Sequence, residues 1–211
     1  MEDLGNPLGN VVEILVDEMK DSAAEQEDDR SFCGLEYRDR AEADRKLLVY
    51  TGEALAHDVE ITGQPVVTLR VTSTHADGNF FVYLEDVAPD GRVTYLTEGE
   101  LRALHRKLSQ APPPYKTTYP YRTFSRADAQ LLTPGQVATL TFQLMATSVL
   151  VRAGHRIRVA IAGADKDNFL RIPAMALGDV TVTVAHGGTG GSFIELPVVP
   201  RSAKASTAAG E

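Results

Sequence analysis

Several common features are missing from this chain of 211 residues, and each absence narrows what the protein does. No apolar run reaches the roughly 18 residues that a transmembrane helix needs, so we expect no membrane association. A single cysteine, Cys33, cannot form an internal disulfide, which agrees with a reducing compartment. The first residues are acidic and carry no basic segment, so we expect no secretory signal. Together these features predict a cytoplasmic protein.

Clustered positive charge is also missing. The formal net charge is −8, and residues 1–46 account for all of it, with fourteen acidic and six basic side chains. Residues 47–211 hold fifteen of each. Nucleic-acid binding requires a basic face, so we expect no nucleic-acid partner. The imbalance predicts that residues 1–46 form an acidic N-terminal extension to a main body over residues 47–200.

The sequence also lacks the motifs of nucleophilic catalysis. A serine nucleophile in the motif G-x-S-x-G sits on a tight strand-to-helix turn, and the nearest segment here is residues 190–194. Ile194 stands where that turn requires glycine, and a strand pattern follows in place of a helix. We therefore interpret Ser192 as a loop residue and expect no catalytic residue and no cofactor in this chain.

Metal ligands are equally sparse. The five histidines show no ligand spacing such as H-x-x-x-H. Asp165, Asp167 and Asn168 offer oxygen ligands that would suit calcium, but the further carboxylates of a calcium loop are absent. A solvated loop with a side-chain-capped turn explains them better, so we predict no metal site. Cys33 has no base near it in sequence and is interpreted as an inert thiol.

Short runs of β-branched residues separated by turn signals begin at Leu47. Apolar and polar residues alternate in these runs, which is typical of a half-buried strand. In two of the runs the alternating apolar residues form a triplet, named below, and we predict that the two triplets share one core layer. A hairpin is predicted from residues 79–85 and 92–96, joined by the turn at residues 88–91. The two triplets are Leu140, Phe142 and Leu144, and Ile157, Val159 and Ile161.

About eight such strands with little helix predict an all-β antiparallel sandwich. The pattern alone does not separate a jelly roll from an immunoglobulin-like sandwich. A short amphipathic helix is predicted over residues 11–19, residues 21–30 read as a polar linker, and residues 201–211 as a disordered tail. Residues 101–107 have the propensities of a helix, but an extended strand remains the alternative at this place in the chain.

Four sequence segments, which occur in the order expected for a known family, resemble that family. They are Ala153–Phe169, Leu48–Thr51, Asp58–Gly63 and Tyr121–Phe124. Together they resemble the C-terminal β-domain of the X-Pro dipeptidyl-peptidase and cocaine-esterase-like (CocE/NonD) serine hydrolases.

The resemblance covers roughly residues 44–200 and implies a jelly roll similar to galactose-binding domains. In that family an α/β-hydrolase half carries a Ser-Asp-His triad, and we find no sign of that half here. The resemblance therefore implies a non-catalytic accessory domain whose partner is an α/β-hydrolase domain or subunit. Without that partner, we expect the uncovered surface to pair with a second copy as a homodimer. The competing expectation is that Val11, Ile14, Leu15 and Met19 fold back over this surface within one chain.

Aromatic residues gather around a proline-rich segment, and three explanations remain open: a protein interface, local packing and a ligand site. In the resembled family this segment is associated with the hydrolase domain, which implies a protein interface. A stand-alone module that binds a carbohydrate or another small ligand is the alternative, because exposed aromatic rings stack on sugars. His155 has either a structural role at a strand start or a contact to a catalytic domain. The candidate interface residues are Tyr115, Tyr119, Tyr121, Phe124 and His155.

Overall fold

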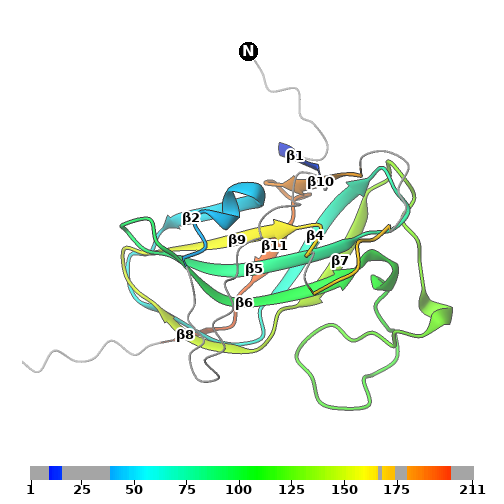
Figure 1. Ribbon diagram of the computed structural model, residues 1–211. Coiled ribbons are helices and arrows are strands. Elements are labelled where there is room, and N and C mark those ends of the chain that lie inside the picture. Colours follow the sequence, from blue (N-terminus) through cyan, green and yellow to red (C-terminus); the bar gives the residue numbers. More distant parts are fainter. Residues whose placement is uncertain (1–9, 16–38, 166–167, 174–179, 201–211) are drawn as a thin grey trace, which may run out of the picture.

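Two antiparallel β-sheets face each other in the computed structural model (Figure 1), which describes residues 10–15, 39–165, 168–173 and 180–200. This confirms the predicted all-β sandwich. Consecutive strands repeatedly change sheets, as between β4 and β5 or β9 and β10, which is the connectivity of a jelly roll. The strands are β1 (Asn10–Leu15), β2 (Leu48–Ala54), β3 (Val59–Gly63), β4 (Val66–Ser73), β5 (Asn79–Val87), β6 (Val93–Arg102), β7 (Ala138–Gln143), β8 (Thr147–Val151), β9 (Arg156–Ala162), β10 (Thr181–His186), β11 (Phe193–Glu195) and β12 (Val198–Val199).

The first sheet is built around β4. One edge of β4 pairs with β7 along its length, and the other edge is shared by β10 at one end and β11 at the other. β1 lies outside β10, with Asn10 opposite His186 and Leu15 opposite Thr181. A small additional sheet of β12, β3 and β8 lies beside the sandwich.

The second sheet has the order β2-β9-β5-β6. Its hairpin of β5 and β6 turns at residues 88–91, as predicted, with Gly91 at a positive φ of 92° that glycine adopts without strain. Short 3-10 helices occupy the loops: η2 (Ala43–Lys46), η3 (Ala103–His105) and η4 (Arg126–Asp128).

Both predicted triplets face the core between the sheets. Leu140, Phe142 and Leu144 are at most 2% exposed, and Ile161 is buried from the opposite sheet. Ile157 and Val159 are partly buried and pack against the same cluster. The prediction of a shared core is therefore confirmed, with the triplets on facing sheets.

The two sheets are joined closely along one side, where β6 meets the end of β7. The backbone N–H of Met145 donates to the carbonyl of Glu98 at 2.7 Å, and the Thr97 hydroxyl donates to the Met145 carbonyl. A Cβ on Gly99 would lie 2.5 Å from the Gln143 carbonyl oxygen, so only glycine permits this approach.

Some predictions fail or fall outside the described residues. The helix over residues 11–19 is wrong for its first half, because residues 10–15 pair with β10 as strand β1. Sheet pairing satisfies the backbone of a segment that is too short to be stable as a helix. Residues 101–107 combine both alternatives, since β6 ends at Arg102 and η3 follows. The linker over residues 21–30, the tail over residues 201–211, and Cys33 lie outside the described residues.

No helix in the described ranges is long and apolar enough to span a membrane. The domain boundary at residues 46–47 remains a prediction, and the structure adds that the proposed extension contributes β1 to the first sheet.

Candidate functional site

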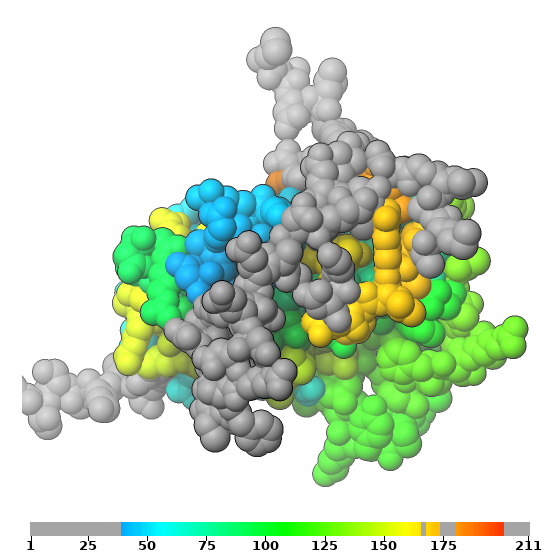
Figure 2. Space-filling model, viewed as in Figure 1, coloured from blue at the N-terminus to red at the C-terminus, as the bar shows by residue number. Residues whose placement is uncertain are grey.

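A long excursion between η3 and β7 carries most of the predicted interface residues. We call residues 106–131 the arm. Pro112, Pro113, Pro114 and Pro120 remove backbone donors and fix φ, so most of this segment cannot join a sheet. The arm projects from the body of the sandwich in Figure 1 and forms the green lobe at the lower right of Figure 2.

A buried guanidinium fixes the base of the arm. Arg122 is 6% exposed, and its Nε donates to the carbonyl of His105 at 2.7 Å while Nη2 donates to the carbonyl of Thr141. Burial lowers the pKa of Arg122 to about 10. A charged donor satisfies both carbonyls here, which ties the arm to η3 and to β7.

A second set of contacts closes the arm into a loop. Arg106 donates to the carbonyls of Gln130 and Leu131, the latter at 2.9 Å. Lys107 forms an ion pair with Asp128, which also accepts from the Thr123 hydroxyl at 2.6 Å. The arm is therefore held at its base by side-chain donors.

Aromatic rings occupy the outer part of the arm. Tyr115 is 51% exposed, and its ring meets that of Tyr121 edge to face at 5.9 Å, with an interplanar angle of 84°. A hydrogen bond with Tyr119 raises the pKa of the Tyr115 hydroxyl. Because the two rings are perpendicular, they do not form one flat platform on which a sugar would stack.

Phe124 combines exposure with backbone strain. It is 64% exposed, and its φ of 51° lies in the left-handed region that bulky residues avoid. Its ring contacts His105 at 5.4 Å. Such strain costs on the order of 1–3 kcal/mol and is concentrated at functional sites, so Phe124 fits a contact surface.

His155 lies away from the arm. Its Nδ1 is 2.8 Å from a carboxylate oxygen of Asp86, and its carbonyl accepts from the N–H of Leu55. Asp86 lies near the turn of the β5–β6 hairpin, whereas Arg102, after which the chain enters η3 and then the arm, lies at the other end. At about 3.3 Å per residue these two positions are roughly 20 Å apart, so His155 is far from the start of the arm. The structure thus brings together four of the five predicted residues and gives His155 a bond that fits the structural alternative.

A buried charged cluster on the outer face of the second sheet was not predicted. Glu85 on β5 has no exposed surface and Asp44 in η2 is 2% exposed. Arg40 Nε is 2.6 Å from Glu85 Oε1, and Arg158 lies 3.5 Å from Asp44. The Arg40 guanidinium also lies over the Tyr83 ring at 4.4 Å.

Burial, the charge of Asp44 and a hydrogen bond to Asp44 raise the pKa of Glu85 to about 7, against the opposing effect of Arg40. Neither Glu85 Oε2 nor Asp44 Oδ1 has another hydrogen-bond partner among the described residues, although Arg40 Nη2 lies 3.5 Å from Asp44 Oδ1 as an ion pair. One proton shared between the two carboxylates satisfies both oxygens. We call Arg40, Asp44, Glu85 and Arg158 the outer cluster. The sequence signal for it is β5 itself, which carries apolar or aromatic residues on both faces and so predicts that both are covered.

Ser192 and Asp165, which the sequence offered as chemically reactive or metal-binding residues, make structural hydrogen bonds. Ser192 Oγ accepts from the backbone N–H of Arg70 at 2.9 Å, and strand β11 follows it in place of a helix. Asp165 accepts from the backbone N–H and the side-chain amide of Asn168, which makes a capped turn. Asp167 lies outside the described residues. Within the described residues, no group of three or more histidine, cysteine or acidic side chains is placed to hold a metal ion.

Comparison with known families gives one extended match. The family described as the X-Pro dipeptidyl-peptidase C-terminal non-catalytic domain matches residues 12–192. A Mycobacterium bovis protein named as a serine esterase is 55% identical over 163 residues, which cover 77% of this chain and 26% of that protein. The cocaine esterase of a Rhodococcus species is 29% identical over 119 residues, which cover 56% of this chain and 18% of the enzyme.

Solved structures agree in fold. An aminopeptidase from a marine sediment archaeon of the Thaumarchaeota superposes with a TM-score of 0.69 at 19% identity, covering 90% of this chain and 33% of that one. An α-amino acid ester hydrolase superposes with a TM-score of 0.64 at 20% identity, covering 77% and 27%. The chain thus spans between about a fifth and a third of the proteins that it resembles.

Proposed function

Because this chain belongs to the family of the X-Pro dipeptidyl-peptidase C-terminal non-catalytic domain, we propose that it completes a serine hydrolase whose catalytic half is a separate α/β-hydrolase domain or subunit. The resemblance stated from the sequence is thereby confirmed at the level of the family. The observation that carries the proposal is the 55% identity to a protein named as a serine esterase, of which this chain matches only 26%. The substrates proposed for the completed enzyme are acyl esters, amides or Xaa-Pro peptides, as the names of the relatives suggest.

The arm is the proposed contact with the hydrolase domain. Its base is fixed by buried donors, and its outer part presents Tyr115 and Phe124 to solvent. Exposed tyrosine and phenylalanine on a pre-positioned loop are typical of protein interfaces, and each ring buries a large area at little entropic cost. Carbohydrate binding receives less support, because Tyr115 and Tyr121 are perpendicular.

The proposal extends to assembly and location. Without a hydrolase partner, we expect the exposed aromatic surface to pair with a second copy, and two-fold pairing is the default closed arrangement. Light scattering on the chain alone then gives twice the monomer mass of 22.8 kDa. A mass that stays at the monomer value on concentration contradicts the dimer. The single cysteine in the sequence supports the proposal of a cytoplasmic location.

A reconstitution experiment tests the central proposal. The Mycobacterium bovis relative is expressed without the region that this chain matches, and this chain is added in trans. We expect binding by calorimetry and an increase in hydrolysis of p-nitrophenyl acetate or Ala-Pro-p-nitroanilide. This chain alone is expected to show neither turnover nor labelling by a fluorophosphonate, since no nucleophile elbow is present.

Variants distinguish the arm from the rest of the surface. Tyr115→Ala and Phe124→Ala are expected to weaken binding about tenfold or more, as for central aromatic residues of an interface. Val137→Ala is the matched control, because Val137 is also exposed, at 45%, but lies outside the arm. Equal binding by all three variants contradicts the arm as the contact, and activity of the chain alone contradicts the non-catalytic role.

A further inference from the structure

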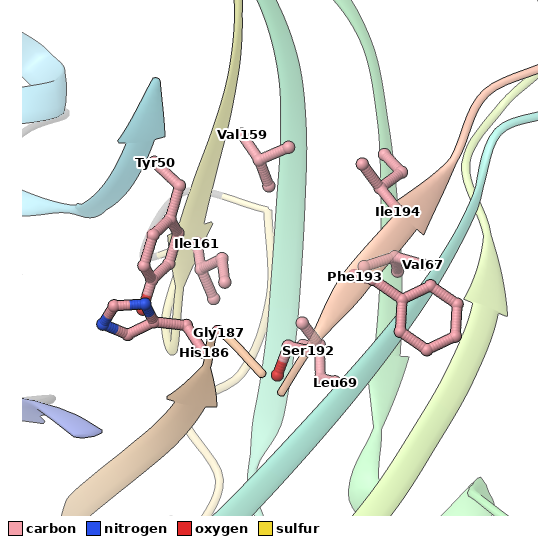
Figure 3. A pocket seen from close by; sticks show the side chains of 10 residues that line it. All are labelled: Tyr50, Val67, Leu69, Val159, Ile161, His186, Gly187, Ser192, Phe193 and Ile194. Atoms are coloured by element: carbon pink, nitrogen blue, oxygen red, sulfur yellow. The ribbon is translucent and has the colours of Figure 1, made fainter. Parts of the chain in front are cut away.

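The sandwich is open on the side opposite the β6–β7 contact. There a cavity of about 290 Å³ lies between the two sheets (Figure 3). Val67 and Leu69 of β4 form one wall, and Val159 and Ile161 of β9 form the other. Both walls belong to the apolar core or pack on it, so the cavity is a continuation of the core that the described residues do not fill.

The topology of the first sheet explains the opening. β10 and β11 share one edge of β4, and the chain between them turns through glycines, with Gly187 at a φ of 74°. Glycines bring no side chains to fill the space that the turn surrounds. Phe193, which lines the cavity, is 51% exposed, so the cavity communicates with solvent.

One hydrogen-bond donor in the cavity has no partner among the residues that the structure describes. The Tyr50 hydroxyl of β2 is buried and makes no hydrogen bond with the described residues. Leaving a buried hydroxyl unpaired costs on the order of 1–3 kcal/mol, so a hydroxyl in this position calls for an explanation. Burial also raises the pKa of Tyr50 to about 12, which keeps the hydroxyl protonated and able to donate near neutral pH.

The other polar groups of the cavity lie beside Tyr50 or are already engaged. The His186 ring lies 5.0 Å from the Tyr50 ring, at a tilt of 54°, and Figure 3 shows the two side chains together at one end of the cavity. Ser192 accepts from the Arg70 backbone. No lysine or arginine lines the cavity among the described residues. A carboxylate would therefore be buried without a permanent counter-charge, which is unfavourable.

We propose that this cavity is a binding site for a neutral small molecule with an apolar, aromatic or branched body and one carbonyl or ether oxygen that accepts from Tyr50. A dry apolar cavity of about 150 Å³ accepts benzene, so the volume here suits a ligand of about twelve non-hydrogen atoms. The apolar walls favour a ligand with an apolar body, and the Tyr50 hydroxyl favours a ligand that carries a hydrogen-bond acceptor. This site is independent of the proposed hydrolase contact, because its walls are strand residues of the two sheets and none belongs to the arm.

A pair of matched probes tests the proposal on the full chain. Acetophenone carries an acceptor, and ethylbenzene has nearly the same shape without one. We expect acetophenone to shift the methyl NMR signals of Val67, Val159 and Ile161 and to raise the melting temperature with concentration. Ethylbenzene is expected to shift the same signals with a several-fold larger Kd.

Two variants separate the hydroxyl from the walls. Tyr50→Phe is expected to weaken acetophenone binding about fivefold and to leave ethylbenzene binding unchanged, in line with the loss of one hydrogen bond. Val159→Phe fills the cavity and is expected to abolish binding of both probes. Val137→Phe, an exposed position, is the matched control and is expected to bind as the wild type does.

Three outcomes overturn the proposal. The first is the absence of shifts in the cavity methyl groups with either probe. The second is a Tyr50→Phe variant that binds acetophenone as tightly as the wild type. The third is binding that appears only after residues 1–9 are deleted, which would mean that the cavity does not accept a ligand in the full chain. Tyr50→Phe changes a single atom, so the test does not depend on whether Val159→Phe folds.

Discussion

The two faces of β5, in the β2-β9-β5-β6 sheet, are both covered, but by different means. On the inner face, Phe80, Val82 and Leu84 of β5 are at most 2% exposed within an apolar core. On the outer face, Tyr83 and Glu85 alternate with them and lie under Arg40 and η2. The inner face is stabilised by removing apolar surface from water, which does not depend on pH.

The outer face is stabilised by matched charges, which do depend on pH and on each partner being present. One strand therefore contributes to an apolar core on one face and to a buried charged cluster on the other. The apolar core tolerates substitutions that conserve side-chain volume, whereas the charged cluster tolerates only substitutions that keep its charges balanced.

The largest expected effect tests the inner face. Phe142→Ala removes a ring that is 2% exposed and faces β5 across the core. We expect the free energy of unfolding to fall by about 3–5 kcal/mol, from lost transfer energy and the cavity left behind. Urea denaturation followed by circular dichroism measures it, and a loss below about 1 kcal/mol would show that the ring does not contribute to the core as assigned.

The next effect tests the outer face. Arg40→Met keeps the length and apolar stem of the side chain but removes the cation that pairs with Glu85 at 2.6 Å. At pH 8 we expect the free energy of unfolding to fall by about 2–4 kcal/mol, because a buried carboxylate loses its counter-charge. The same denaturation experiment at pH 5 should show a smaller loss, and equal losses at both pH values would contradict the charge argument.

A pH profile sharpens the contrast between the faces. The pKa of Glu85 is about 7 in the folded protein and has a reference value of 4.5. Because the folded state holds the proton more tightly, this contribution to the free energy of unfolding is complete below about pH 4.5. As the pH rises to about 7 this contribution is lost, and the free energy of unfolding falls by about 1–3 kcal/mol.

Glu85→Gln replaces the carboxyl with a group of the same shape that does not titrate. We expect this variant to lack that loss between pH 5 and pH 7, while Phe142→Ala retains it. Denaturation at four pH values compares the slopes of the two variants with that of the wild type. A wild-type slope in Glu85→Gln would mean that another group is responsible.

The smallest expected effect comes from the same segment as Arg40. Arg45 forms an ion pair with Glu42 at 3.1 Å, but these side chains are 74% and 81% exposed. Arg45→Met should change the free energy of unfolding by less than about 0.5 kcal/mol, because exposed pairs are screened by water. It is the matched control for Arg40→Met, and a comparable loss in both would show that the cost arises from the η2 backbone and not from the buried cluster.

The sequence predicted the elements whose patterns are local. Alternation at Leu140, Phe142 and Leu144 and the Pro-Asp-Gly turn depend on neighbouring residues only, and both were predicted correctly. The aromatic residues of the arm were also found, because Tyr115 and Phe124 stand out in a proline-rich segment.

Features that depend on distant pairing could not be predicted. Residues 10–15 have an apolar pattern that suits a helix, and only the edge of β10 makes them a strand. The outer cluster joins Arg40 and Asp44 to Glu85 and Arg158, which are far away in the chain. The apolar pattern on both faces of β5 was the available signal that Glu85 would be covered. His155 was grouped with the arm from its family phrase, although its position follows from its bond with Asp86.

The pairing of β1 with β10 has a consequence for the order in which the protein assembles. β1 is synthesised well before β10, with which it pairs, and the second edge of β4 is covered only once β10 and β11 have been made. Until Thr181 and the residues after it have been synthesised, the edge of β4 at Val71–Ser73 and Val66–Thr68 has no partner in this sheet. An open edge of this kind recruits other extended chains. Nascent or truncated chains that end before β10 are therefore the species most prone to aggregate, and β10 and β11 protect the edge of β4 within the same chain.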